Sequence, residues 1–447
     1  MVTTVKQFTS SPAVSRLVAA LGIIVATLAI CLPGISTFHG VSLYDEITHF
    51  DNAYKIGVEH RIPADIEPLS EVALEEWACR PGTWQMNPDQ LCNLAQDGNA
   101  SHDGFPVEGL NYNGFHPPLY YAVTGAGGSI LSSLTGQTLF VSIRVMSALW
   151  LAGGAVAFFL VAARWLRSTL LGCSATILLV SLPPVASFGM MINPDATAVL
   201  AGTIAVWSLL LVVRGNRRAP LLIGLAAFLV AGLKLLLVAP LLVALVILGL
   251  RALTVAGSDA AGRRVSLLSL PAGMVGVAAS ALINRALTAS SGLANPVAGL
   301  STTPVGESSP LAILIGTVGE NYSLLTPYWL PEGHEGVAWT ASTNLVEVLV
   351  VAAPLIIIWA GRPRTPEFAL ATVTITSALA LPLAIQAREI LTSDAYFQTL
   401  ATRYSLVVIP LAIMCVALAV RQLPAPKTIM CGLATVTFVS ALVSIVD

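Results

Sequence analysis

Charged side chains are scarce in this chain. Only 10% of its 447 residues are Asp, Glu, Lys or Arg, whereas a soluble domain carries about 25%. Hydrophobic residues make up 55%, and the mean hydropathy is +0.80. This composition excludes a soluble globular enzyme, a disordered protein and a nucleic-acid-binding protein. It predicts an all-α, polytopic membrane protein.

The motifs of common soluble enzymes are absent as well. The sequence has no G-x-G-x-x-G after a strand, no G-x-x-x-x-G-K-[ST] and no H-E-x-x-H. ATP-driven transport by this chain alone is therefore not expected. Paired acids near a membrane surface could bind a divalent ion, so no cofactor is certain and a divalent metal stays open.

Cysteines are few, and most of them fall in apolar segments. There are six, and only Cys79 and Cys92 lie in a long polar loop, in "CRPGTWQMNPDQLC". On an oxidising outer face these two are expected to form a disulfide. Two free thiols are the alternative, and metal binding is disfavoured because no His or second Cys pair lies nearby.

Long apolar runs, by contrast, fill most of the chain. Eleven are expected to cross the membrane, with 219–250 divided into two short helices that turn at Gly232–Lys234. The predicted spans are 14–38, 139–163, 169–191, 196–213, 219–233, 235–250, 266–287, 343–360, 367–387, 404–420 and 428–446. The first is predicted to be a retained helix rather than a cleaved signal peptide, because no small-x-small site follows it.

The basic residues predict the orientation. With the N-terminus in the cytoplasm, 14 of the 22 Lys and Arg residues fall on the cytoplasmic side, but only Asp259 and Glu367 of the 24 acids do. The expected location is a bacterial plasma membrane. Residues 1–447 then form one transmembrane domain with two long outer loops, 39–138 and 288–342. Within these loops, 117–136 and 310–328 are expected to be helices lying on the membrane.

The first outer loop opens with a cluster of ionisable residues. "SLYDEITHFDNAYKIG" places Asp45, Glu46 and His49 at the membrane surface, and Asp45 and His49 share a face if the segment is helical. A carboxylate beside a His at that depth suits a general base. An acidic helix end in a solvated loop is the alternative.

Three more segments place polar residues at the same membrane level. His116 and Tyr120 lie in "NYNGFHPPLYYA", where an ordinary helix start is the alternative. Asn193 and Asp195 lie in "MMINPDATAVL", between two spans. Lys234 is an isolated cation in "AGLKLLLVAP" that could meet a lipid phosphate or reach the headgroups instead.

Two arginines complete a candidate cationic set. Arg403, followed by Tyr404, and Arg144 each enter a predicted span from the outside. With Lys234 they could hold a phosphate in the outer leaflet, although each alone could be an interfacial anchor. In the second loop a sugar-stacking rim is a weaker expectation. Its candidate residues are Glu320, Asn321, Tyr322, Trp329, Glu332, His334 and Glu335.

These motifs recur in one order in a known family. "YDEITHFDNAYKIG", "FHPPLYYA", "INPDATA", "GLKLLLVAP" and "TRYSLVVIP" together resemble the GT-C membrane glycosyltransferases. The branch is similar to protein O-mannosyltransferases and to the lipid A aminoarabinose transferase. The resemblance covers most of the chain in topology and about fifty residues in motifs.

The resemblance implies a sugar donor linked to polyprenyl phosphate and an extracytoplasmic glycan, lipid or protein acceptor, with membrane lipids around the chain and no nucleic acid. Asp45 matches the family's general base, Glu46 completes its acidic pair and Asp195 matches its second acid. Substrate-binding roles fall to His49, His116, Tyr120, Asn193, Lys234, Arg403, Tyr404 and Arg144.

Two other classes of function remain open. A transporter or flippase of lipid-linked sugars should place ionisable groups at the membrane midplane and often has inverted repeats. A non-catalytic assembly subunit with the same fold should tolerate Asp45→Asn.

Overall fold

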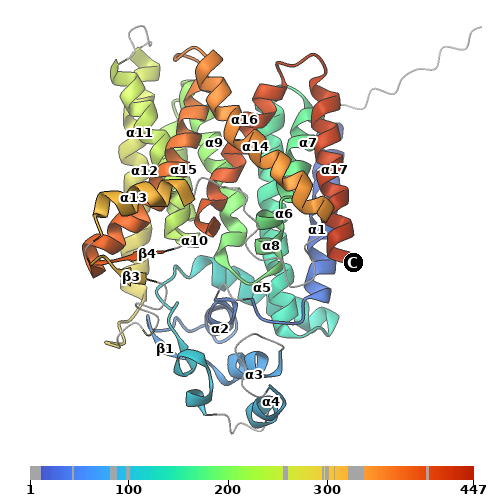
Figure 1. Cartoon of the computed structure of the whole chain (residues 1–447), viewed down its shortest axis with the longest axis vertical. Coiled ribbons are helices and arrows are strands. Elements are labelled where there is room, and N and C mark those ends of the chain that lie inside the picture. The colour runs from blue at the N-terminus through green and yellow to red at the C-terminus, as the bar shows by residue number, and fades with distance from the viewer. Residues whose placement is uncertain are drawn as a thin grey trace, which may run out of the picture.

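The computed structural model describes residues 12–42, 45–80, 88–96, 101–254, 260–293, 296, 302–306, 308–320, 337–398 and 402–446. The predicted rim residues 321–335 lie outside this part of the chain. A bundle of long helices forms the body of the molecule (Figure 1). Its members are α1 (Pro12–Thr37), α6 (Leu139–Leu166), α7 (Thr169–Val180), α8 (Pro183–Met190), α9 (Ala198–Val213), α10 (Ala219–Leu233), α11 (Ala239–Thr254), α12 (Ala260–Leu287), α14 (Val337–Ala360), α15 (Pro366–Ser393), α16 (Ile409–Val420) and α17 (Pro426–Val446).

The all-α, polytopic membrane fold is confirmed. Within the described residues nine helical segments are long and apolar enough to span a membrane, and a tenth is the bent pair α7–α8. The remaining predicted span is α10, whose 15 residues cover about 22 Å. It ends before Lys234, and α11 follows after the short 3-10 helix η4 (Leu235–Val238), so the predicted division of 219–250 is correct.

The predicted span 169–191 is not one continuous helix. It bends by 69° between α7 and α8, next to the pair Pro183–Pro184. Proline lacks an N–H donor and disfavours helical backbone in the residue before it, so Leu182 is extended. The indole N–H of Trp339 on α14 donates to the Ser181 carbonyl at 2.8 Å. The Ser181 carbonyl at the break therefore has a hydrogen-bond partner on a neighbouring helix, as a polar backbone group in a membrane requires.

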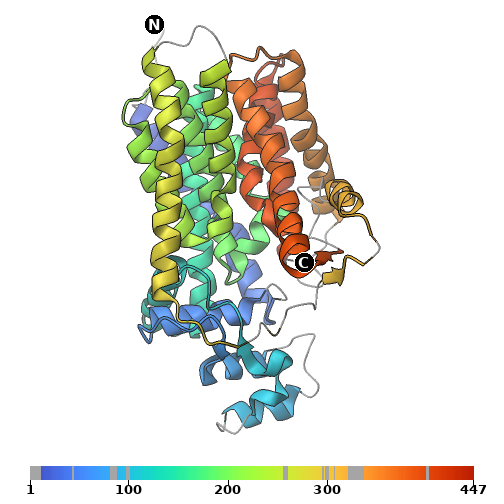
Figure 2. The ribbon, with the colours of Figure 1, turned by 90° about the vertical axis from the view of Figure 1, so that its left-hand side faces the viewer.

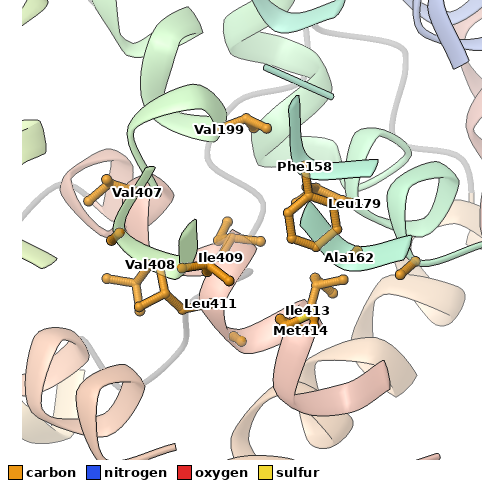
Figure 3. Close-up of a cluster of buried hydrophobic side chains, with 14 of the residues drawn as sticks. Phe158, Ala162, Leu179, Val199, Val407, Val408, Ile409, Leu411, Ile413 and Met414 are labelled. Carbon is orange, nitrogen blue, oxygen red and sulfur yellow. The ribbon is translucent and has the colours of Figure 1, made fainter. Parts of the chain in front are cut away.

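The core lies where α6, α7, α9 and α16 meet. Figure 3 shows Phe158 and Ala162 of α6 beside Leu179 of α7 and a run of side chains from α16 and the preceding 3-10 helix η5 (Thr402–Val408). Every residue of α16 from Ile409 to Leu418 is buried. Such a uniformly apolar helix belongs at the centre of a bundle, while α1 and α12 keep large apolar side chains on the outside for lipid.

The predicted first loop folds into a small unit at one end of the bundle. It contains α2 (Glu46–Gly57), β1 (Glu67–Pro68), α3 (Glu71–Cys79), α4 (Pro88–Gln96), η1 (His102–Gly104), η2 (Pro106–Gly109), β2 (Leu110–Asn111) and α5 (Leu119–Thr135). Figure 2 shows α2 lying across the long axis of the bundle. The predicted disulfide Cys79–Cys92 is present and joins α3 to α4. We call this end of the molecule the loop end.

Two small sheets hold the loop segments. β1 pairs with β2 in antiparallel register, Glu67 opposite Asn111. β3 (Thr302–Pro304) pairs with β4 (Ala395–Phe397), next to α13 (Pro310–Glu320). α5 and α13 match the two helices expected within the loops, although 321–328 lies outside the described residues. The start of α1 and the end of α17 lie toward opposite ends of the bundle (Figures 1 and 2), as an odd number of spans requires.

Candidate functional site

Asp45 lies at the N-terminus of α2 and is held from two sides. Its backbone is left-handed, with φ 60° and ψ 21°, which a short polar side chain tolerates better than most. The Tyr112 hydroxyl donates to Oδ1 at 2.7 Å, and Nη2 of Arg403 donates to Oδ2 at 3.2 Å. The carboxylate is 24% exposed, so it is bound by protein groups and still accessible.

A second carboxylate–cation pair is buried. Asp195 lies in the 3-10 helix η3 (Pro194–Thr197), whose N-cap Asn193 accepts a hydrogen bond from the Asp195 amide. Nζ of Lys234, at the break between α10 and η4, lies 2.7 Å from Asp195 Oδ1. The other oxygen, Oδ2, is buried and has no hydrogen-bond partner among the described residues. An orphaned buried carboxylate oxygen is costly, which makes it a candidate contact for a ligand.

Two histidines lie beside the ion pairs. Nδ1 of His49 is 2.8 Å from the Tyr121 hydroxyl, and the rings of His49 and His116 have centroids 5.5 Å apart. Burial lowers the pKa of both imidazoles well below 6.5, and the charges of Lys234 and Arg403 lower it further. Both rings are therefore neutral near pH 7 and can exchange hydrogen bonds with uncharged polar groups.

These electrostatic interactions show that the groups form one cluster. Each histidine interacts with both Lys234 and Arg403, and Arg403 interacts with Asp195 as well as with Asp45. The structure thus brings together residues from α2, the loop before α5, η3, the α10–η4 break and η5. We call Asp45, Asp195, His49, His116, Lys234 and Arg403 the charged cluster.

Glu46 and Arg144 form a separate, fully buried pair. Glu46 Oε1 accepts from Arg144 Nε and from the Ile192 amide, and Oε2 accepts from Arg144 Nη2 and the Ser42 amide. Arg144 also donates to the carbonyls of Phe38 and Gly40. With both side chains 0% exposed, these contacts fix α2 and the approach to η3 against α6.

The two tyrosines predicted to bind substrate, Tyr120 and Tyr404, differ in their contacts. The Tyr120 hydroxyl is 2.7 Å from Ser147 Oγ on α6, and its ring packs edge-on against Tyr121. Tyr120 is fully buried and so joins α5 to α6. The Arg403 guanidinium lies over the ring of Tyr404, 5.4 Å from its centroid.

Sequence reasoning missed Tyr112 and Tyr121, the two hydroxyls that contact Asp45 and His49. Tyr112 belongs to an Asn-Tyr-Asn triplet that is fastened to α2. Asn111 Nδ2 donates to Asp51 Oδ2 at 2.7 Å, and Asn113 Nδ2 donates to Thr48 Oγ1 at 2.7 Å. Three consecutive polar residues just before the His116 motif were the available signal for this contact.

The described part of the chain has no group of three or more His, Cys, Asp or Glu side chains arranged to hold a metal ion. No family model matches the chain, and no curated protein matches it.

Proposed function

We propose that this protein is a GT-C-like glycosyltransferase that moves a sugar from a polyprenyl-phosphate donor to an acceptor hydroxyl on a glycan, lipid or protein. The observation that carries the proposal is the charged cluster, which combines two cations, two carboxylates and two neutral imidazoles at the loop end. The loop end is proposed to face outward from a bacterial plasma membrane, with the N-terminus in the cytoplasm.

The donor phosphate is assigned to Lys234 and Arg403. Both cations lie near the loop end, where a lipid phosphate would be found, and each forms an ion pair with an aspartate. Arginine offers a planar fork of N–H donors and lysine a compact charge, so the two can share one phosphate group. Their positive charge would stabilise the polyprenyl phosphate as it leaves.

The acceptor hydroxyl is assigned to Asp45. Its Oδ2 would accept the hydroxyl proton while the acceptor oxygen bonds to the anomeric carbon. The bond from that carbon to the phosphate oxygen then breaks, and the polyprenyl phosphate departs with the electron pair. The partial exposure of Asp45 supports this role, whereas the complete engagement of Glu46 and Arg144 supports a structural role for that pair.

The remaining members of the cluster are assigned to the sugar. The unpartnered Oδ2 of Asp195 could accept a hydrogen bond from a sugar hydroxyl. The neutral rings of His49 and His116 could likewise exchange hydrogen bonds with sugar hydroxyls. Hydrogen bonds of this kind orient the anomeric carbon between the phosphate and the base.

The test uses purified protein in lipid nanodiscs with radiolabelled polyprenyl-phosphate hexoses and pentoses and a cell-envelope extract as acceptor. Loss of a general base costs roughly 10²–10⁴-fold, so Asp45→Asn should reduce the rate of transfer by that factor. Asp394→Asn is the matched control, because Asp394 is also a left-handed aspartate at a helix end and ends α15 instead. Undiminished turnover by Asp45→Asn would remove the base assignment.

Donor binding is tested separately. Arg403→Gln and Lys234→Gln should each weaken binding of the labelled polyprenyl-phosphate sugar by about tenfold or more. Because Lys234→Gln leaves Asp195 buried without its cation, the double variant with Asp195→Asn controls for stability. Unchanged donor affinity in both cation variants contradicts the phosphate assignment.

Movement of a lipid-linked sugar across the membrane is a second candidate. The bent pair α7–α8 and the buried pair Asp195–Lys234 favour it, since broken helices and buried ionisable residues are typical of transporters. Proteoliposomes loaded with the labelled donor distinguish the two: net translocation without transfer in any extract supports transport.

A further inference from the structure

We propose that Tyr112 is a positioning residue that holds the Asp45 carboxylate in place while its second oxygen changes partner during transfer. This inference rests on the proposed function, because it requires Asp45 to accept the proton of the acceptor hydroxyl. It assigns a task to a residue that belongs to neither the cations nor the acids of the charged cluster.

The two oxygens of Asp45 are bound by different segments of the chain. Tyr112, from the loop before α5, binds Oδ1 at 2.7 Å, and Arg403, from η5, binds Oδ2 at 3.2 Å. The proposed function requires Arg403 to turn to the donor phosphate. Without Tyr112 the carboxylate would then lose the contact that fixes its orientation, at the moment when the base must be aligned.

Tyr112 is itself firmly held. Asn111 Nδ2 donates to Asp51 and also to the Thr48 carbonyl and Asn52 Oδ1. On the other side, the Asn113 carbonyl accepts from Asn52 Nδ2 at 2.9 Å. These bonds fasten the triplet to α2, the same helix whose N-terminus Asp45 caps, so Tyr112 and Asp45 are held by one helix.

Tyr112 also remains a hydrogen-bond donor throughout. Burial raises the pKa of its phenol, and the neighbouring Asp45 carboxylate raises it further. The phenol therefore keeps its proton and serves only to bind Oδ1. When Arg403 joins Lys234 at the phosphate, Oδ2 becomes free to take the proton of the acceptor hydroxyl.

The test is the kinetics of Tyr112→Phe, which removes only the hydroxyl. We expect kcat to fall about 10- to 100-fold, while KM for the donor and donor affinity stay within about twofold of wild type. An interaction that matters mainly in the transition state gives this split, whereas a general structural defect lowers donor binding as well. In the Asp45→Asn background, Tyr112→Phe should have no further effect on residual turnover.

The matched control is Tyr54→Phe. Tyr54 lies on the same helix α2 and also hydrogen-bonds a carboxylate, that of Glu59, away from the charged cluster. Wild-type kcat is expected for this variant. If Tyr112→Phe does not fold, Asn113→Ala loosens the triplet through its bond to Thr48. It should then show the same loss of kcat, and an unchanged kcat overturns the inference.

The outcomes separate the two proposals. Wild-type kcat in Tyr112→Phe, together with an inactive Asp45→Asn, overturns the role of Tyr112 and leaves the transferase intact. Absence of transfer by the wild-type protein, or full turnover by Asp45→Asn, overturns the proposed function and this inference with it. A fall in both donor affinity and kcat assigns Tyr112 a general structural role instead.

Discussion

Asp45 and Glu46 are adjacent acids with opposite environments. Glu46 is buried and accepts four hydrogen bonds, two of them from Arg144. A buried carboxylate so well satisfied is costly to disturb, and removing one partner of such a pair costs about 3–5 kcal/mol. Glu46 therefore fixes α2, whereas the preceding carboxylate, Asp45, is 24% exposed and accessible to other molecules.

The buried histidines predict a dependence of stability on pH. In the folded protein His49 and His116 have a pKa well below 6.5, so they resist protonation that the unfolded chain accepts. Below about pH 6.5 the unfolded state binds more protons, and the free energy of unfolding falls as the pH falls. Thermal unfolding in detergent at pH 7.5 and 5.5 should show a smaller difference for His49→Gln than for wild type. An equal difference in the two proteins contradicts this prediction.

Most members of the charged cluster could be predicted from the sequence, but the contacts that these residues make could not. Asp195 and Lys234 were each conspicuous, as an acid after a proline and a cation among apolar residues. Their mutual ion pair depends on how η3 packs against the α10–η4 break, which no local pattern encodes. Tyr112 was missed for the same reason, because tyrosine is ordinary near a membrane surface and its partner lies 67 residues away.

At the scale of elements, the glycines of α5 let α2 approach. A side chain on Gly125 would collide with the Ala53 carbonyl of α2, and one on Gly57 would meet the backbone of α5. Small residues at crossing points allow helices to pack with their backbones close together. The Gly-rich composition of 117–136 thus sets the depth at which α2 presents Asp45 and His49.

Adding one methyl group should reveal this constraint. Gly125→Ala forces α2 and α5 apart, and overpacking of this kind costs about 1–3 kcal/mol. The control is Gly153→Ala on α6, where a Cβ meets open space and the helix should gain up to about 1 kcal/mol. Thermal unfolding of the two variants beside wild type measures the difference. A stable Gly125→Ala protein would mean that the crossing is not tightly packed.

Helix boundaries were predictable where a local signal marks them. Pro194, the Arg-rich ends and the Gly232–Lys234 turn all coincide with element ends in the structure. The break at residues 181–182 was not predicted, because the apolar run continues through it. Pro183 and Pro184 were the local signal for it. The contact that stabilises the break comes from Trp339, 158 residues away.

At the scale of the molecule, the Arg-rich links and the charged cluster lie at opposite ends of the bundle. Arg164, Arg218 and Arg421 lie at helix ends far from the loop end, on the side that the positive-inside rule assigns to the cytoplasm. The loop end holds the disulfide Cys79–Cys92, which belongs in an oxidising compartment. Two independent features thus favour the same orientation.

Cysteine labelling can test this orientation. Gln137→Cys, between α5 and α6, should react with a membrane-impermeant maleimide on intact cells. Gln422→Cys, between α16 and α17, should react only after the cells are permeabilised. Both positions are exposed, and the unsubstituted chain measures the background from the native cysteines. The reverse pattern would invert the topology and place the charged cluster in the cytoplasm.

The contact between Asp45 and Arg403 also has a consequence for biosynthesis. The two residues are 358 positions apart, so the ribosome synthesises Asp45 long before Arg403. No nascent chain that lacks η5 and α16 contains a complete charged cluster. The cluster is therefore completed only after α15 has been synthesised, and the proposed function predicts that a product ending before η5 is inert toward lipid-linked substrates.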